Sequence, residues 1–206
     1  MSKKEETSSY NELVEKTGLT EMETAKWKEV QEKIYLPRKE GTKLLEQFEG
    51  YFELDNVTIE KYDENDWPIR PEALKTKKAK ETQINKQADV VMLLHLMGNE
   101  FDDETIKENY AYYEKRTLHG SSLSPSIYSV MGLKVGDDSK AYRYLRRAAF
   151  IDLLNMQGNT REGIHAANTG GVWQTIVFGF AGVSQREDGK LRVCPNMPEE
   201  LSLIHI

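Results

Sequence analysis

The fold is decided by residues 85–98, which read NKQADVVMLLHLMG. Apolar side chains dominate this stretch from Val90 to Met97, with Asp89 immediately before them and Gly98 immediately after. An acidic residue suits the positive end of a helix dipole and glycine commonly ends a helix, so the pattern predicts a buried helix. The apolar run is far shorter than the ~20 residues that span a bilayer. We therefore expect a chain built around buried helices, with no membrane partner.

The residues that follow predict a mainly α fold. Helical spacing recurs at about 103–114, 123–133, 139–155 and 172–181. Candidate helix caps and helix-ending glycines stand between these segments: Gly98, Asp102, Asp103, Gly132, Gly136, Asp137, Asp138 and Ser139. We therefore expect consecutive helical hairpins over residues 85–182.

Residues 1–37 predict one more helical hairpin. Its first helix is expected around residues 11–16, with a stop at Gly18. Thr20 and Glu23 then have the spacing of a capping box, in which each side chain bonds the other residue's backbone amide at the start of a helix. The second helix is expected to end at Pro37, which has no backbone N–H to donate.

Residues 38–84 predict a connecting segment. The helical period is absent between Gly41 and Pro71, where aromatic residues stand among acidic ones. Loops of this length in compact proteins are often functional. After residue 182 the pattern changes again, because a turn at Gly189 and a short strand that ends near Pro195 predict the start of a β-sheet domain over residues 183–206.

Composition limits the classes of function. The 206 residues suffice to bury a core without disulfides or a structural metal. The net charge of −6, from 28 basic and 34 acidic residues, offers no basic excess for a nucleic-acid backbone. Cys194 has no partner cysteine, and the amino end lacks the apolar core of a signal peptide. We expect a cytoplasmic protein that binds no nucleic acid.

Two polar turns precede predicted helices. The first, residues 116–124, contains His119, Gly120, Ser121 and Ser122. Exposed amides at a helix start, with hydroxyls beside them, suit an anion. The second, residues 163–171, contains His165, and the two turns could converge on one ligand rich in oxygen atoms. Equally, the serines and glycines could only satisfy the amides of the helices that they precede.

Other residues could recognise a sugar. Lys86, Gln87 and Asp89 stand together at the start of the most apolar helix, where they could bind hydroxyls or form an ordinary solvated helix start. Aromatic residues and Glu114 lie just ahead of the first polar turn, and sugars stack on aromatic faces, although protein cores use them too. His119 and His165 could instead bind a metal, but no HExxH motif and no paired cysteines accompany them.

Several of these stretches, in this order, resemble family 65 of the glycoside hydrolases, the maltose, trehalose, kojibiose and nigerose phosphorylases. The stretches are Trp27–Pro37, Glu46–Phe52, Lys86–Val90, Tyr112–Ser124 and Gly163–Gly182. The resemblance implies the later part of an (α/α)6 barrel, followed by the start of a carboxyl-terminal β-sheet domain. It also implies that full-length members commonly form homodimers.

The resemblance further implies a reaction. Inorganic phosphate is a co-substrate that attacks the anomeric carbon of an α-linked glucose disaccharide and gives β-glucose 1-phosphate and glucose. The family's enzymes are expected to use no metal and no organic cofactor. An inverting displacement needs an acid for the leaving oxygen and a nucleophile on the opposite face of the ring. Because phosphate is the nucleophile, an anion cradle replaces the base carboxylate.

The resemblance also assigns roles to residues. His119, Gly120, Ser121, Ser122 and His165 are expected to bind phosphate. Lys86, Gln87 and Glu114 are expected to hold the glucose.

No residue of the chain matches the family's general-acid glutamate, which is expected upstream. The chain therefore reads as a fragment that is inactive by itself. Two alternatives stay open: a hydrolase of the same family, which uses activated water in place of phosphate, and a helical carbohydrate-binding fragment without catalysis. The glucosidic linkage that is cleaved cannot be read from these residues.

Overall fold

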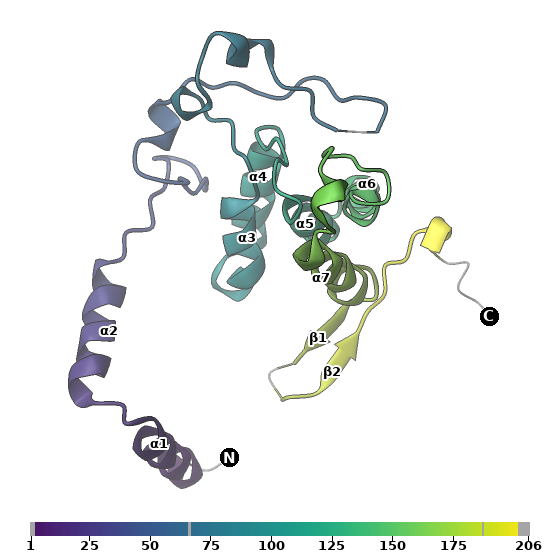
Figure 1. Ribbon diagram of the computed structural model, residues 1–206. Coiled ribbons are helices and arrows are strands. Elements are labelled where there is room, and N and C mark those ends of the chain that lie inside the picture. Colours follow the sequence, from purple (N-terminus) through teal and green to yellow (C-terminus); the bar gives the residue numbers. More distant parts are fainter. Residues whose placement is uncertain (1–2, 66, 187, 202–206) are drawn as a thin grey trace. The chain divides into compact units, whose positions relative to one another are not determined.

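The computed structural model describes residues 3–65, 67–186 and 188–201. The chain divides into two compact units, Met1–Leu36 and Pro37–Ile206 (Figure 1).

The first unit is a pair of helices, as the sequence predicts. Helix α1 covers Lys3–Thr17 and α2 covers Glu21–Lys33. The predicted capping box is confirmed, since the Glu23 amide donates to Thr20 Oγ1 over 3.2 Å and the Thr20 amide donates to Glu23 Oε2 over 3.0 Å. Helix α2 ends at Lys33, four residues before the predicted end at Pro37, because Ile34 is already extended. The apolar residues that follow Lys33 are exposed, so no burial offsets the cost of holding β-branched and aromatic side chains in a helix.

The connecting segment is held down by an aromatic residue. The helical elements among its described residues are short 3-10 turns, at Tyr51–Glu53, Glu72–Lys75 and Ala79–Glu81. Tyr51 is buried, and its hydroxyl donates to the carbonyl oxygen of Gln83 over 2.6 Å. Tyr51 is therefore tied to the carboxyl end of the segment.

The second unit is mainly helical over residues 89–180, as predicted. Its elements are α3 Asp89–Leu96, a 3-10 turn Gly98–Glu100, α4 Asp103–Glu114, α5 Ser124–Val135, α6 Asp138–Phe150, and α7 Ala166–Gln174, which continues as a π-helix over Thr175–Phe180. Asp102 and Asp137 are the side-chain caps of α4 and α6. None of the helices in the described residues is long and apolar enough to cross a membrane.

Glycines caused two of the errors in the predicted boundaries. We expected Gly132 to end a helix, and residues up to Gly171 to form a turn before a helix at 172. Both glycines instead lie inside helices: a Cβ on Gly132 would come within 3.1 Å of Ala141, and one on Gly171 within 2.5 Å of Ser126. They allow neighbouring helices to approach closely. Gly136, at φ +83°, does end α5 in the way that the sequence indicates.

The predicted helix at 139–155 is too long by about one turn. Residues after Phe150 form turns, in which Asn155 has φ +48°, a left-handed conformation that asparagine tolerates better than most residues. The chain there leaves the helix axis and begins a loop that reaches α7.

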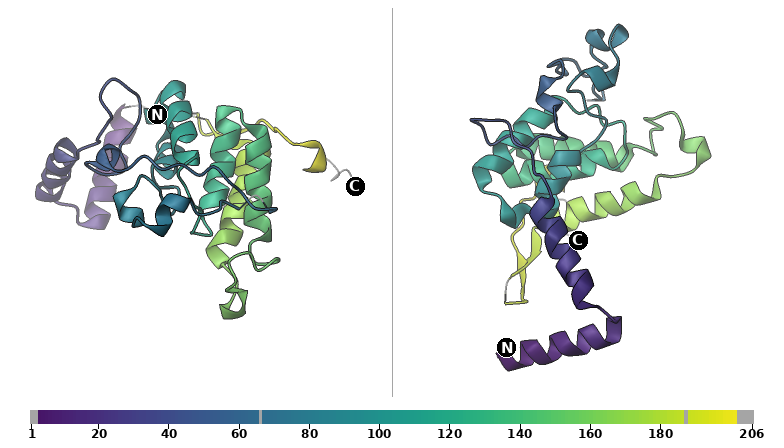
Figure 2. Two further views of the ribbon diagram at one scale, coloured as in Figure 1. Left: turned by 90° about the horizontal axis from the view of Figure 1, so that it is seen from above. Right: turned by 90° about the vertical axis from the view of Figure 1, so that its left-hand side faces the viewer.

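Helices α3, α5 and α7 run parallel to one another. The start of α3 lies by the start of α5 at Ser124, and Gly98 after α3 lies by Lys134 near the end of α5. In the same way Gly171 of α7 packs on Ser126, and Gly179 packs farther along α5 on Leu133. Helices α4 and α6 contact α5 and run antiparallel to it (Figure 2). The amino ends of α3, α5 and α7 therefore face the same end of the unit.

A short β-hairpin follows the helices. Strands β1, Val183–Gln185, and β2, Leu191–Val193, pair antiparallel with Ser184 opposite Arg192. The strand predicted before Pro195 is thus present, with a partner that we did not predict.

Replacing Gly132 with alanine should destabilise the second unit by about 1–2 kcal/mol, because the new methyl group overpacks the contact of α5 with α6. Gly170→Ala is the matched control: Gly170 is also helical, and a Cβ there would meet nothing within 4 Å. That control should gain up to about 1 kcal/mol from helix propensity. Urea unfolding monitored by circular dichroism measures both, and a rise in stability for both variants would contradict the close approach.

Candidate functional site

Two of the predicted polar segments lie side by side. The amide of Asn85 donates to the carbonyl of Arg116 over 2.7 Å, and the amide of Leu118 donates back to the carbonyl of Asn85 over 2.8 Å. One step further along, the amide of Gly120 donates to the carbonyl of Lys86 over 2.8 Å. This short parallel pairing, which joins residues 85–86 to residues 116–120, sets the start of α3 beside the start of α5. We call it the segment pairing.

Next to the segment pairing lies a cavity of about 260 Å³, lined from Gln87 and Ser121, the residues that follow the paired ones. Its lining combines an amide, a carboxylate and hydroxyls with apolar side chains: Gln87, Ala88, Asp89, Met92, Ser121, Leu123, Ser124 and Ile127. We call it the paired-turn cavity. Concave sites with an apolar wall and a few convergent polar groups are typical of small-ligand binding.

Asp89 orients the polar wall of this cavity. One carboxylate oxygen accepts from Gln87 Nε2 over 2.9 Å, and the other accepts from Gln47 Nε2 over 2.8 Å. Since both side-chain amides turn their donors toward Asp89, Gln87 keeps its carbonyl oxygen as an acceptor for a ligand hydroxyl. Gln47 comes from the connecting segment, and spacing along the sequence gave no indication of this contact.

His119 lies behind the cavity and is only 1% exposed. Its ring Nδ1 lies 2.9 Å from Ser124 Oγ, and its Nε2 lies 3.2 Å from the Tyr144 hydroxyl. Burial, followed by the nearby positive charge of Arg147, lowers the pKa of His119 well below 6.5. The ring is therefore neutral at physiological pH.

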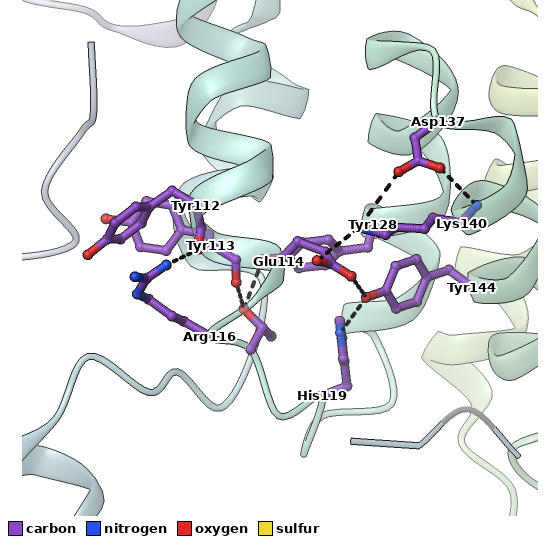
Figure 3. Close-up of polar contacts among 10 residues, drawn as sticks. Tyr112, Tyr113, Glu114, Arg116, His119, Tyr128, Asp137, Lys140 and Tyr144 are labelled. Carbon is purple, nitrogen blue, oxygen red and sulfur yellow. Dashed lines mark hydrogen bonds and ion pairs between the residues drawn. The ribbon is translucent and has the colours of Figure 1, made fainter. Parts of the chain in front are cut away.

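The hydrogen bonds of His119 have a fixed direction. The Tyr144 hydroxyl donates to a carboxylate oxygen of Glu114 over 3.1 Å, while the other oxygen of Glu114 pairs with Lys140 over 3.1 Å (Figure 3). Because the Tyr144 hydroxyl uses its proton to donate to Glu114, it accepts a hydrogen bond from Nε2–H of His119. In a neutral ring the other nitrogen is an acceptor, so Nδ1 accepts from the hydroxyl of Ser124. A continuous buried chain thus runs from the paired-turn cavity to Lys140.

His119 also has an unusual backbone conformation. Its φ is +52°, which a residue other than glycine seldom adopts. Such strain of about 1–3 kcal/mol persists only where surrounding contacts hold it. Here the hydrogen bonds of both ring nitrogens and the amide of Gly120 hold the turn, which projects Ser121 into the cavity.

The structure brings together only part of the predicted site. Gln87 and Ser121 line the paired-turn cavity, and Gly120 is packed on the side chain of Lys86, where a Cβ would come within 3.3 Å. Ser122 is half-buried in the same turn. Glu114, in contrast, lines a separate cavity of about 240 Å³ with Lys140 and Tyr144.

The second polar turn contributes His165 from another helix. His165 is the residue immediately before α7, and its ring bonds Asp152 rather than capping the helix. Among the contacts of the described residues none joins His165 to Ser121. The two face the same end of the unit because α5 and α7 are parallel.

Residues 1–174 match the profile described as "Glycosyl hydrolase family 65 central catalytic domain". The chain is 53% identical over 191 residues, or 93% of its length, to the kojibiose phosphorylase of Thermoanaerobacter brockii, and 32% identical over 98% of its length to the α,α-trehalose phosphorylase of the same organism. It covers 25% and 26% of these relatives, so the chain spans about a quarter of their length.

A solved structure from the human microbiome, assigned as a kojibiose phosphorylase, matches 92% of this chain with a TM-score of 0.74 at 33% identity. The match covers 25% of that structure.

The buried histidine should make the fold sensitive to acid. The unfolded chain binds a proton at His119 near pH 6.5, whereas the folded chain does not, so lowering the pH favours unfolding. Between pH 7.5 and 5.5 this costs about 1.4 kcal/mol. Asparagine tolerates positive φ, so His119→Asn keeps the conformation of the turn. Urea unfolding at both pH values should show that this variant loses about 1.4 kcal/mol less of its free energy of unfolding than the wild type does. Equal losses in the two proteins would contradict a neutral buried ring.

Proposed function

The chain belongs to glycosyl hydrolase family 65, and we propose that it forms the phosphate- and glucose-binding part of an inverting disaccharide phosphorylase. The proposed substrate is kojibiose, because the chain is 42–54% identical to three kojibiose phosphorylases and 31–35% identical to the trehalose, nigerose and maltose phosphorylases. The products are then β-glucose 1-phosphate and glucose.

The segment pairing is the observation that carries this proposal. It places Gln87, proposed to bind a glucose hydroxyl, in one cavity with Ser121, proposed to bind phosphate. An inverting phosphorolysis needs these two ligands in contact, with a phosphate oxygen on the face of the ring opposite the leaving group. The Ser124 hydroxyl donates to His119, so the Ser121 hydroxyl and the amides at the start of α5 are the donors proposed for the anion.

Each predicted residue has a part in this mechanism. Ser121 and Ser122 cradle phosphate, and His165 approaches from the start of α7. Gly120, whose amide donates to the Lys86 carbonyl, holds the turn that carries both serines. Lys86 and Gln87 bind glucose hydroxyls. His119 accepts a hydrogen bond from the Ser124 hydroxyl and thereby positions Ser124. Glu114 accepts from the Tyr144 hydroxyl, which in turn accepts from His119, so Glu114 holds the ring in place. The acid that protonates the leaving oxygen is a glutamate supplied from outside these 206 residues.

The helix arrangement supports the barrel that this family implies. In an (α/α)6 barrel, parallel inner helices alternate with outer helices that run the opposite way. Helices α3, α5 and α7 would be inner helices, and α4 and α6 outer ones, with the hairpin of residues 1–37 as an earlier pair and residues 183–206 as the start of the final β-sheet domain. The amino ends of the inner helices would then surround the active site. Homodimerisation would belong to the complete enzyme.

A graft tests the proposed reaction. The 191 residues that align with the Thermoanaerobacter brockii kojibiose phosphorylase would replace their counterparts in that enzyme. We expect release of glucose 1-phosphate from kojibiose only when phosphate is present. Ser121→Ala should raise the KM for phosphate about 10–100-fold, because the variant loses a hydrogen bond to a charged group. Gln87→Ala should mainly raise the KM for kojibiose.

Ser139→Ala is the matched control, since this exposed serine at the start of α6 lies outside the paired-turn cavity. Its kinetic constants should equal those of the unmutated graft. Glucose release that is independent of phosphate would instead make the chain part of a hydrolase. A folded graft that binds kojibiose but releases nothing would favour a carbohydrate-binding function.

A further inference from the structure

A second pair of polar side chains lies outside the paired-turn cavity. The carboxylate of Asp152 holds His165 at two points: Oδ2 accepts from the backbone amide over 2.8 Å, and Oδ1 lies 2.6 Å from ring Nδ1. Asp152 follows the end of α6 and His165 precedes α7, so the pair closes the loop between these helices. Both the backbone and the ring of His165 are thereby fixed by one carboxylate.

This contact determines which ring nitrogen carries the proton. A carboxylate only accepts hydrogen bonds, so Nδ1 carries the hydrogen. The other nitrogen, Nε2, lies 3.4 Å from the side-chain Nδ2 of Asn159, which is a donor. Hydrogen bonds from His165, its side chain first and its backbone second, lower the pKa of Asp152, which therefore stays ionised at neutral pH. In this arrangement Nε2 is the ring nitrogen that faces Asn159 and not the carboxylate.

The pair is also accessible enough to meet a ligand. The side chain of His165 is 23% exposed and that of Asp152 is 16% exposed, so both are partly buried and both reach solvent. His165 also precedes the first amides of α7, whose dipole favours an anion at this end.

We propose that Asp152 is a positioning residue for phosphate binding. Its carboxylate accepts from Nδ1–H of His165 and thereby directs Nε2 of the same ring at the anion. A dihydrogen phosphate ion displaces Asn159 from Nε2 and transfers one proton to that nitrogen. The result is a hydrogen phosphate dianion paired with an imidazolium ring, whose other N–H donates to Asp152. This inference rests on the phosphorolysis proposed above, because that reaction gives His165 its ligand.

Asp152→Asn separates this role from a merely structural one. The new side chain keeps an oxygen for the backbone amide of His165 and turns its NH₂ group toward the ring. Nδ1 of His165 then has to accept a hydrogen bond from this NH₂ group, so the ring proton moves to Nε2. The imidazolium form of the ring loses the carboxylate that accepted from Nδ1–H. Histidine ring ¹⁵N spectra of the 206-residue chain report this directly. We expect Nδ1–H in the wild type, Nε2–H in Asp152→Asn, and Nδ1–H again in Asp152→Glu.

Binding of inorganic phosphate to the same proteins is the second measurement. Asp152→Asn should raise the dissociation constant about tenfold, the difference between a charge-assisted and a neutral hydrogen bond. Asp152→Glu should recover most of the affinity. Thr160→Val is the matched control, because it removes only a 3.4 Å bond from the Thr160 hydroxyl to the Asp152 carbonyl and leaves the carboxylate in place.

The outcomes separate this inference from the proposed function. A tautomer that does not change in Asp152→Asn overturns the inference whether or not the graft is active. A changed tautomer with unchanged phosphate affinity also overturns it, while phosphorolysis could still rely on Ser121. In an active graft, Asp152→Asn should raise the KM for phosphate and leave that for kojibiose unchanged; equal changes in both would indicate damage to the fold. An inactive graft, in contrast, counts against the proposed reaction alone.

Discussion

The backbone hydrogen bonds of the segment pairing are the contacts on which the site depends. Residues 85–86 and 116–120 are joined by only a few amide–carbonyl bonds, of 2.7–2.8 Å, yet these fix where α3 and α5 begin relative to each other. Buried backbone groups must find partners, so the pairing cannot slip without leaving some of them unsatisfied. Gln87 and Ser121, which follow the paired residues directly, are positioned by this pairing. The register of this backbone pairing therefore sets the position of the two helix starts that line the cavity.

The buried chain from Ser124 to Lys140 keeps this pairing in shape. His119 holds a left-handed turn, and its neutral ring fills the space between Ser124 and Tyr144 with both nitrogens bonded. The charge of Glu114, itself paired with Lys140, sets the direction of all the hydrogen bonds in the chain. Polar groups at this depth are costly unless they are all paired, so the chain favours a single arrangement of the turn. A rigid turn suits a site that must hold a small anion in one place.

Close helix packing supplies the frame around these groups. Gly132 and Gly171 let α6 and α7 approach α5 without a Cβ between them, and α7 can then lie parallel to α5. This arrangement turns the amino ends of three helices toward one end of the unit. It also brings His165 to that end from a loop that Asp152 holds closed. The convergence of the three helix starts and the position of His165 thus have a common origin in the packing.

The sequence by itself determined the helices, the cap at Thr20 and the polar composition of both turns, because these depend on residues a few positions apart. It narrowed the caps of α4 and α6 to a few neighbouring residues, from which the structure selected Asp102 and Asp137. It also placed Lys86–Gln87 and His119–Ser122 at helix starts. Only the tertiary structure decided that Gly132 and Gly171 pack helices, that Gln47 reaches Asp89, and that Glu114 lies in a separate cavity behind His119. A glycine has the same local signature at a turn and at a close helix contact. Likewise, a carboxylate finds its partner across the fold, where sequence spacing carries no information.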